Sequence, residues 1–530
     1  MKPESARQTL KAWLGRVPGV AELDWHIRRT RPPLRHHLQA AAPYLAKWGP
    51  WAAQQAQQAP SGRKVAVFAM LSPWVAQTAV LSLALAAQGH RVTLGYFPYQ
   101  DWWQPDDRWG WRKWSLHLRE LLKPAAGAFQ VVPLLGEPRD PIPSHWEAAL
   151  VRLSAYDVEY TRQREGADAE DPLYPLRLAR NRTAAGALAH WLRRTQPDVL
   201  VVPNGAILEF GVAYEVARRL GIPVVTYEFE YQREHAWLSQ GMPVMELDTT
   251  DLWKAASAKA LTPQQLTRLQ EMMTARRGGR TWETHARAWQ NVGRAGSQAV
   301  RQRLGLDDRP LVLIATNVFG DSVTIGHQVF TRGMGDWLAE TLRFFARHPQ
   351  VQVVVRVHPG EAKLAPGGTS MLEIVERTLP TLPEHIKVVP PDADINSYDL
   401  VEMAQVGLVY TTTLGLEMAM DGVPVVVAGR VHYRGRGFTL DPTTWEAYFQ
   451  LLEQAVTRPS SLRPSQEQVA LARRYAYHFF FTYPRPYPWH IAFWQESLQQ
   501  WPLPRALEET RFQETLAAFA GAPLRWEQWA

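Results

Sequence analysis

The chain has 530 residues, of which 46% are hydrophobic and 21% are charged, a composition typical of folded domains. This length is enough for roughly two or three domains of about 150 residues. The absence of cysteine excludes disulfides, thiol catalysis and cysteine-ligated zinc or iron–sulfur centres. The net charge of +7 is modest and comes in no long basic block, so we do not expect nucleic acid as a partner.

The N-terminus has scattered charges and lacks the apolar stretch of a signal peptide. The longest apolar run, Val65–Ala87, is interrupted by polar residues, so a strand, a turn and a helix explain it better than a membrane span. We therefore expect a cytoplasmic protein. Contact of its Arg- and Trp-rich outer helices with the inner face of the plasma membrane is an open alternative.

Residues 1–60 are predicted to form a helical appendage, broken at Pro32-Pro33. Short apolar strands then alternate with helices, which indicates parallel βαβ units and a Rossmann-like domain over residues 61–250. Its predicted strands are 64–70, 90–97, 197–205 and 222–230, and its predicted helices are 73–89, 176–195 and 210–220.

A polar segment, residues 251–308, is predicted to be a helical linker with a break at Gly278-Gly279. A second Rossmann-like domain follows over residues 309–460, and residues 461–530 are predicted to form C-terminal helices. The strands of this second domain are expected at 311–316, 351–357, 385–389, 406–410 and 423–429. The pattern predicts an α/β fold with two Rossmann-like domains and extra helices at both ends.

The second domain carries polar segments where its strands end, and parallel sheets bind ligands at that edge. They are residues 316–317, 356–361, 410–417 and 428–442, and we expect them to open into one crevice. Strand alternation sends Arg356 and His358 to the same side, where they can bind a phosphate. Thr411, Thr412, Thr413 and Gly415 precede or begin a helix, whose free N–H groups suit a phosphate.

Each of these features has a second reading. Thr412 or Thr413 could simply cap the helix. Glu417 could accept hydrogen bonds from ribose hydroxyls, or it could act as a capping glutamate. Arg434 and Arg436 lie on a glycine-rich loop, which could be a mobile anion clamp or a solvated turn.

The first domain offers carboxylates at the end of a predicted strand. Glu228 and Glu230 alternate along it and are expected to point the same way. A carboxylate there can take a proton from an acceptor hydroxyl, and pairing raises one pKa. Asn204, Gly205 and Glu209, at the neighbouring strand end, are candidates for positioning the acceptor. A solvated strand end is the alternative.

Motifs for metals and cofactors are missing from the sequence. There is no HExxH, no DxD at a strand end and no GxxxxGK[ST] phosphate loop. We therefore expect neither a metal site nor a cofactor.

The second domain resembles the capsule polysaccharide biosynthesis family. The resemblance is carried by RVHPGE (356–361), INSYDL (395–400), YTTTLGLEMAMDGVPVVVAG (410–429) and HYRGRGFTLDP (432–442). It implies a GT-B-like fold related to bacterial β-Kdo transferases, some of which use CMP-Kdo. By this resemblance, His358, Thr412 and Thr413 bind the donor's phosphate and Glu417 contacts the nucleotide sugar. The family often has an Asp-Gly pair where this chain has YEFE (227–230).

The function expected from these features is metal-independent transfer of a sugar from a nucleotide-sugar donor to a capsule-type glycan or glycolipid. The donor is expected on the second domain and the acceptor on the first. One alternative is a nucleotide-sugar epimerase or polyol-phosphate transferase. Another is a non-catalytic glycan-binding or assembly protein, which the missing Asp-Gly pair favours.

Overall fold

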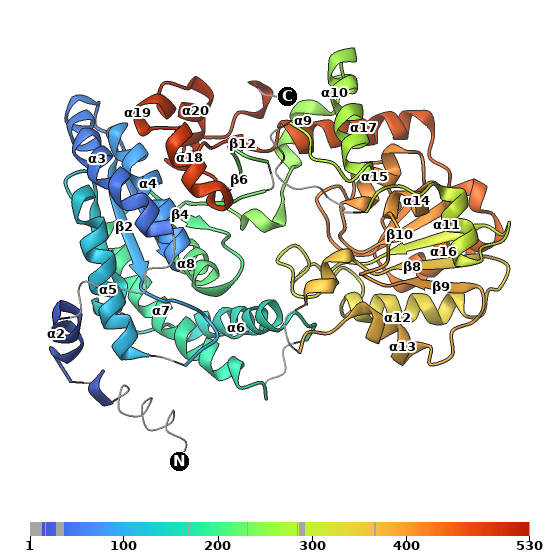
Figure 1. Cartoon of the computed structure of the whole chain (residues 1–530), viewed down its shortest axis with the longest axis horizontal. Coiled ribbons are helices and arrows are strands. Elements are labelled where there is room, and N and C mark those ends of the chain that lie inside the picture. Colours follow the sequence, from blue (N-terminus) through green and yellow to red (C-terminus); the bar gives the residue numbers. More distant parts are fainter. Residues whose placement is uncertain are drawn as a thin grey trace. The chain divides into compact units, whose positions relative to one another are not determined.

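The computed structural model describes residues 13–15, 17–27, 37–105, 107–166, 170–230, 232–283, 285, 292–364 and 367–528. They form two compact α/β units, shown in Figure 1. One unit comprises Met1–Ser154, Ala169–Met245 and Arg485–Leu524, and the other comprises Ala155–Asp168, Glu246–Pro484 and Arg525–Ala530. Each unit has its own sheet, which confirms the predicted fold class.

The first unit is built on a seven-stranded sheet with the order β12-β6-β5-β4-β1-β2-β3. Strands β1 to β5 pair in parallel, whereas β6 and β12 are antiparallel. Their bounds are β1 Lys64–Met70, β2 Arg91–Phe97, β3 Gln130–Pro133, β4 Val199–Pro203, β5 Val224–Glu228, β6 His235–Gln240 and β12 Arg485–Pro486. The parallel strands have the doubly wound order of a Rossmann-like sheet. The sequence had predicted β1, β2, β4 and β5, but neither β3, β6 nor β12.

Helices of the first unit cover both faces of its sheet (Figure 1). They are α2 Val20–Ile27, α3 His37–Gln58, α4 Ser72–Ala87, α5 Arg108–Leu122, α7 Leu173–Thr195, α8 Leu208–Arg219, α18 Trp494–Gln500, α19 Leu503–Ala506 and α20 Thr510–Phe519. Helix α2 packs on the outside of α5. Helix α6, Glu147–Arg162, begins in the first unit and ends in the second. Because α4 is apolar nearly all round, it is buried along most of its length.

One core cluster joins segments from both ends of the chain. Leu45 and Trp48 of α3 lie in it together with Phe512 and Phe519 of α20. Buried hydrogen bonds reinforce this packing, since Tyr227 of β5 donates to Gln77 and Gln77 donates to Tyr487. Residues 37–58 and 485–524 are thus parts of the first unit's core, and the segment predicted as one block at 461–530 is divided between the two units.

The second unit has a five-stranded, fully parallel sheet in the order β11-β10-β7-β8-β9. The strands are β7 Leu311–Ala315, β8 Gln352–Arg356, β9 Ile386–Val389, β10 Ala404–Val409 and β11 Val425–Val427. The central residues of β7, β8 and β11 are Val, Leu or Ile and are buried, as expected for a parallel sheet covered on both faces, whereas Lys387 and Val388 of the edge strand β9 are half-buried. All five predicted strands are present, and their ends agree within two residues.

Helices of the second unit continue the Rossmann-like pattern. They are α9 Thr250–Ala256, α10 Pro263–Arg277, α11 Ser297–Leu304, α12 Met334–Phe345, α13 Met371–Thr378, α14 Ser397–Val401, α15 Leu414–Met420, α16 Trp445–Thr457 and α17 Gln466–Phe481. In Figure 1, α12 and α13 lie on one side of the sheet, and α14 and α15 lie on the other. Among the described residues, no helix has the length and apolar character that crossing a membrane requires.

A close contact between β2 and α7 yields a stability prediction. A Cβ on Gly95 would lie 2.8 Å from the indole of Trp191, which is fully buried. We expect Gly95→Ala to lower the free energy of unfolding by about 1–3 kcal/mol through overpacking. Gly136→Ala is the matched control, because a Cβ there meets nothing within 4 Å. Urea unfolding measures the free energy of unfolding of both variants, and a similar loss in the two would contradict the prediction.

Candidate functional site

Three neighbouring strands of the second unit deliver polar residues to one edge of the sheet. Strands β8, β7 and β10 are adjacent and parallel, so their carboxyl ends meet there. The N–H of His358 donates to Thr316 Oγ1 over 3.0 Å, and the N–H of Thr411 donates to Asn317 Oδ1 over 3.1 Å. These bonds hold the three strand-end loops against one another.

The hydroxyls beside these loops are available in different degrees. Thr411 is 5% exposed, and its Oγ1 has no hydrogen-bond partner among the described residues. Thr412 Oγ1 accepts a long 3.4 Å bond from the N–H of Leu414, and Thr413 makes no side-chain capping bond. A buried hydroxyl without a partner is costly. Thr411 therefore marks a point where water or a ligand would be hydrogen-bonded.

The imidazole of His358 is oriented by its own turn. Its Nδ1 accepts a 3.0 Å hydrogen bond from the N–H of Gly360. In the neutral ring this places the proton on Nε2, because Nδ1 acts as the acceptor. The tautomer therefore has a donor suited to an anionic oxygen.

Arg356 is engaged inside the unit. It is 3% exposed and donates to Pro390 O over 2.6 Å and to Ser397 Oγ over 3.2 Å. Burial lowers the pKa of its guanidinium to about 10, so it remains charged at neutral pH. These contacts tie the end of β8 to the loop before α14. A donor-binding role for Arg356 stays a prediction.

Glu417 lies in a buried polar cluster between helices. Its carboxylate accepts hydrogen bonds from Arg276 of α10 and Tyr398 of α14, and the side chains of Arg276 and Glu417 are each 3% exposed. Burial raises the pKa of Tyr398 well above its usual range, and the charge of Glu417 adds to this. The cluster joins α10, α14 and α15, so Glu417 has a structural role in the second unit. Its contact with the donor stays a prediction.

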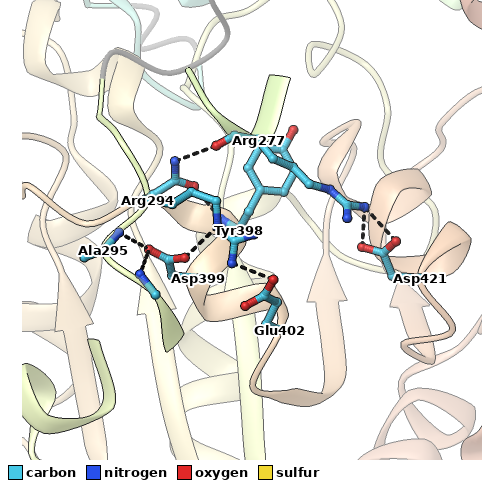
Figure 2. A network of polar contacts seen from close by, with 9 residues as sticks. Arg277, Arg294, Ala295, Tyr398, Asp399, Glu402 and Asp421 are labelled. Atoms are coloured by element: carbon cyan, nitrogen blue, oxygen red, sulfur yellow. Dashed lines mark hydrogen bonds and ion pairs between the residues drawn. The ribbon is translucent and has the colours of Figure 1, made fainter. Parts of the chain in front are cut away.

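A second, partly exposed network lies near Tyr398 of this cluster, as Figure 2 shows. Arg277 pairs with Asp421 over 2.6 Å, and Arg294 pairs with Asp399 over 2.8 Å and with Glu402 over 2.5 Å. The network binds part of the predicted linker to α14. Asn396 joins it by donating to Arg277 O over 2.9 Å, while its Oδ1 caps α14.

The loop after β11 is held by internal contacts. Arg434 donates to Val427 O over 2.5 Å and also to Pro442 O. Arg436 donates to the hydroxyls of Thr249 and Thr250 at 3.3 and 3.2 Å. These bonds fix both side chains, and anion binding by Arg434 and Arg436 stays a prediction.

Gly415 makes room for a tyrosine of that loop. A Cβ on Gly415 would lie 2.3 Å from the hydroxyl oxygen of Tyr433, and this hydroxyl donates to Thr412 O over 2.7 Å. The sequence predicted a close approach at Gly415, and the neighbour in the structure is this side chain. Helix α15 has seven residues, so its dipole is small and we give it no part in the site.

In the first unit, one carboxylate lies at the junction of β4 and β5. Asn204 Nδ2 donates to Glu228 over 3.1 Å, and the N–H of Phe229 donates to it over 2.9 Å. Burial raises the pKa of Glu228. Asn204 has φ 57° and Gly205 has φ 82°, a left-handed turn that aims the Asn204 side chain at the carboxylate. The two strand ends thus form one polar pair.

The other predicted residues of the first unit lie elsewhere. Strand β5 ends at Glu228, so Glu230 lies beyond it and strand alternation does not govern its direction. Its carboxylate accepts a 3.0 Å bond from the N–H of Gln232. Glu209 forms a 2.8 Å ion pair with Arg177, and both side chains are fully buried. Contact of Glu209 with an acceptor stays a prediction that this burial does not support.

Two residues with a shifted pKa or a linking role, Glu361 and Asn317, lie in strand-end segments that the sequence indicated, 356–361 and 316–317. Glu361 accepts hydrogen bonds from Ser370 Oγ over 2.6 Å and from the N–H of Met371, which anchors the turn after His358 to α13. Burial raises its pKa to about 7. Asn317 follows a buried strand, and this was the available signal. No group of three metal-ligating side chains occurs within the described ranges.

The comparisons with known proteins bear on the same part of the chain. Residues 267–459 match the family described as "Capsule polysaccharide biosynthesis protein", a span that includes the strand-end loops of the second unit. The resemblance predicted from the motifs between residues 356 and 442 is thereby confirmed. No curated protein matches the sequence.

Several solved structures are similar at low identity. A β-Kdo 2,4 transferase, KpsC of Thermosulfurimonas dismutans, is 17% identical over 61% of this chain and 88% of its own, with a TM-score of 0.37. Its β-Kdo 2,7 transferase structure is 15% identical over 56% and 81%, with a TM-score of 0.32. The UDP-GlcNAc 2-epimerase of Neisseria meningitidis is 12% identical over 79% and 99%, with a TM-score of 0.26. Because these TM-scores are below 0.5, the similarities do not indicate the function of this chain.

The buried cluster predicts a large loss of stability when Glu417 is neutralised. Glu417→Gln leaves the charge of Arg276 buried without an anion, so we expect a loss of about 3–5 kcal/mol in the free energy of unfolding. Asp421→Asn is the control, because the Asp421–Arg277 pair is 31% and 28% exposed and is worth about 1 kcal/mol or less. Urea unfolding compares the two, and equal losses would refute the structural role of Glu417.

Glu361 predicts a pH dependence of stability. Its folded-state pKa of about 7 lies above the ordinary glutamate value of 4.5, so the folded state binds its proton more tightly than the unfolded state. This contribution is fully present below about pH 4.5 and is lost as pH rises through about 7. Between pH 5 and pH 8 the free energy of unfolding of the wild type should fall by roughly 2–3 kcal/mol more than that of Glu361→Gln.

Unfolding by urea at both pH values measures this difference. Glu376→Gln, which changes an exposed glutamate on α13, should show the wild-type pH dependence. If Glu361→Gln keeps that dependence too, the raised pKa of Glu361 is wrong.

Proposed function

Residues 267–459 of this chain belong to the capsule polysaccharide biosynthesis protein family, and on that premise we propose that the chain is a glycosyltransferase of capsule synthesis. It moves a sugar from a nucleotide-sugar donor, with a CMP-linked donor as the first choice to test, onto a glycan or glycolipid acceptor. The second unit binds the donor and the first unit activates the acceptor. Contact with a membrane surface stays a prediction from the sequence.

The convergence of His358, Thr411 and Thr412 at one sheet edge is the observation that carries the donor half of the proposal. His358 presents an Nε2–H, and Thr411 presents a buried hydroxyl that lacks a partner among the described residues. Donors fixed before the reaction stabilise charge that develops on a leaving phosphate. We assign that charge stabilisation to these side chains, with Thr413 beside them and without a metal ion.

The acceptor half of the proposal rests on Glu228. An acceptor hydroxyl oxygen attacks the anomeric carbon of the donor and forms the new glycosidic bond, while Glu228 takes the hydroxyl proton. The bond from the anomeric carbon to the phosphate oxygen breaks, and the nucleotide leaves with the electron pair. Burial raises the pKa of Glu228, which makes its carboxylate a stronger base. Asn204 orients the carboxylate through its 3.1 Å hydrogen bond.

The proposal predicts that donor binding and turnover can be separated by mutation. Among CMP, UDP, GDP and CDP, we expect one to raise the melting temperature by binding the folded protein. His358→Ala should remove that rise. Glu228→Gln should keep the rise and lower turnover of the matching labelled nucleotide sugar by roughly 10²–10⁴-fold.

Glu496→Gln is the matched control, because this glutamate of the first unit is 67% exposed and pairs only with Arg233 among the described ion pairs. Its turnover should equal that of the wild type. Full turnover in Glu228→Gln would remove the assigned base. Isomerisation of the labelled donor without an acceptor would show an epimerase, and an absence of any nucleotide-dependent shift would favour a non-catalytic protein.

A further inference from the structure

A second concave site lies in the first unit, away from the Asn204–Glu228 pair. It is a cavity of about 710 Å³ between the end of α5 and the last two strands of the sheet, β2 and the edge strand β3. Ligand pockets typically measure about 300–1,000 Å³, so this one is large enough for a small ligand or part of a longer one. The elements α5 and β2 can be followed in Figure 1.

The floor of the cavity is apolar and partly aromatic. Tyr96 and Phe129 are buried in it, and Leu122 and Val131 extend it. The turn at residues 126–128 has the sequence Ala-Gly-Ala, whose small side chains leave the space open. Because β3 is the last strand of the sheet, no further strand closes this side.

The rim of the cavity is cationic. Arg91, Arg119 and Lys123 line it, and no Asp or Glu does. All three are exposed, and none of them forms an ion pair with any residue that the structure describes. The charge of Arg119 also reaches Tyr96 in the floor of the cavity. Burial raises the pKa of Tyr96, and the positive charge of Arg119 partly opposes this rise.

Local structure explains only part of this charge. Cations at the end of a helix interact favourably with its dipole, which accounts for Arg119 near the end of α5 and Lys123 just after it. The same two residues are four apart, however, and like charges at that spacing repel by about 0.2–0.5 kcal/mol. Arg91 begins a strand, so no helix dipole stabilises it.

We propose that this cavity, named here the α5–β3 pocket and lined by Arg91, Arg119 and Lys123, binds carboxylate-bearing sugars of an acidic glycan. Sugar rings have apolar C–H faces that suit the exposed Ala126 and the half-buried Ala128 and Val131 above this floor. A sugar carboxylate accepts charge-assisted hydrogen bonds from the rim. This inference rests on the proposed function, because the glycan would be the acceptor or the growing product. The pocket holds the chain through sugars other than the one that reacts.

Direct binding tests the pocket independently of turnover. A sialic acid oligomer, chosen as a carboxylated probe, should bind the full-length protein in calorimetry, with an affinity that falls as salt rises. A neutral maltose oligomer should not bind. The double variant Arg119→Gln/Lys123→Gln should weaken the acidic oligomer by about tenfold or more.

Arg218→Gln is the control, since this arginine of the first unit is 56% exposed and lies outside the pocket. It should bind the probe as the wild type does. Nucleotide-dependent thermal shifts of the double variant should also equal the wild type, which shows that the protein is folded.

Other outcomes overturn the inference. Equal binding of the acidic oligomer by wild type and double variant removes the pocket as its site. If inorganic phosphate binds the pocket as tightly as the oligomer, it is a simple anion site. If phosphatidylglycerol vesicles bind through Arg119 and Lys123 and the oligomer does not, the surface contacts membrane. The two proposals can also fail separately. If the wild type does not bind the oligomer but turns over a short acceptor normally, the pocket inference is wrong and the proposed function stands. If the wild type binds the oligomer but shows no turnover, only the proposed catalytic function is wrong.

Discussion

Parallel pairing of β8, β7 and β10 is the constraint on which the candidate donor site depends. It places Thr316, His358 and Thr411 at one edge of the sheet although they are far apart in sequence. Two hydrogen bonds between their loops then fix the spacing, and the turn at Gly360 fixes the tautomer of His358. The site is therefore assembled from backbone geometry first, and its side chains are oriented by the loops that this geometry brings together.

The polar residues of the motifs divide into two groups with different physical tasks. Thr411 has a buried hydroxyl without a partner among the described residues, and the turn after His358 fixes the tautomer of its ring. Arg356 and Glu417 are used inside the unit, where they tie α14 and α15 to neighbouring elements. Breaking a buried charge pair costs several kcal/mol because the remaining charge lacks a partner. Arg356 and Glu417 therefore stabilise the elements that carry the site, and their contact with the donor stays a prediction.

The first unit shows a comparable division around its own strand ends. Glu228 combines burial with a raised pKa and a neighbouring amide, the properties needed by a base. Glu209, close to it along the sequence, forms a fully buried pair with Arg177. On another side of the unit, the α5–β3 pocket combines an apolar floor with a cationic rim. The proposed proton transfer by Glu228 and the proposed binding of the glycan thus occur at separate sites of the first unit.

The sequence by itself determined the two Rossmann-like sheets, the five strands of the second unit and the resemblance of that unit to the capsule polysaccharide biosynthesis family, because buried parallel strands and their polar ends leave a local pattern. It could not show that residues 485–524 return to the first unit, since their apolar side chains have no sequence feature that names a partner. It also could not show that Glu417 is paired inside the unit. Only the tertiary structure decided that pairing, because its partner Arg276 lies 141 residues earlier in the chain, on α10.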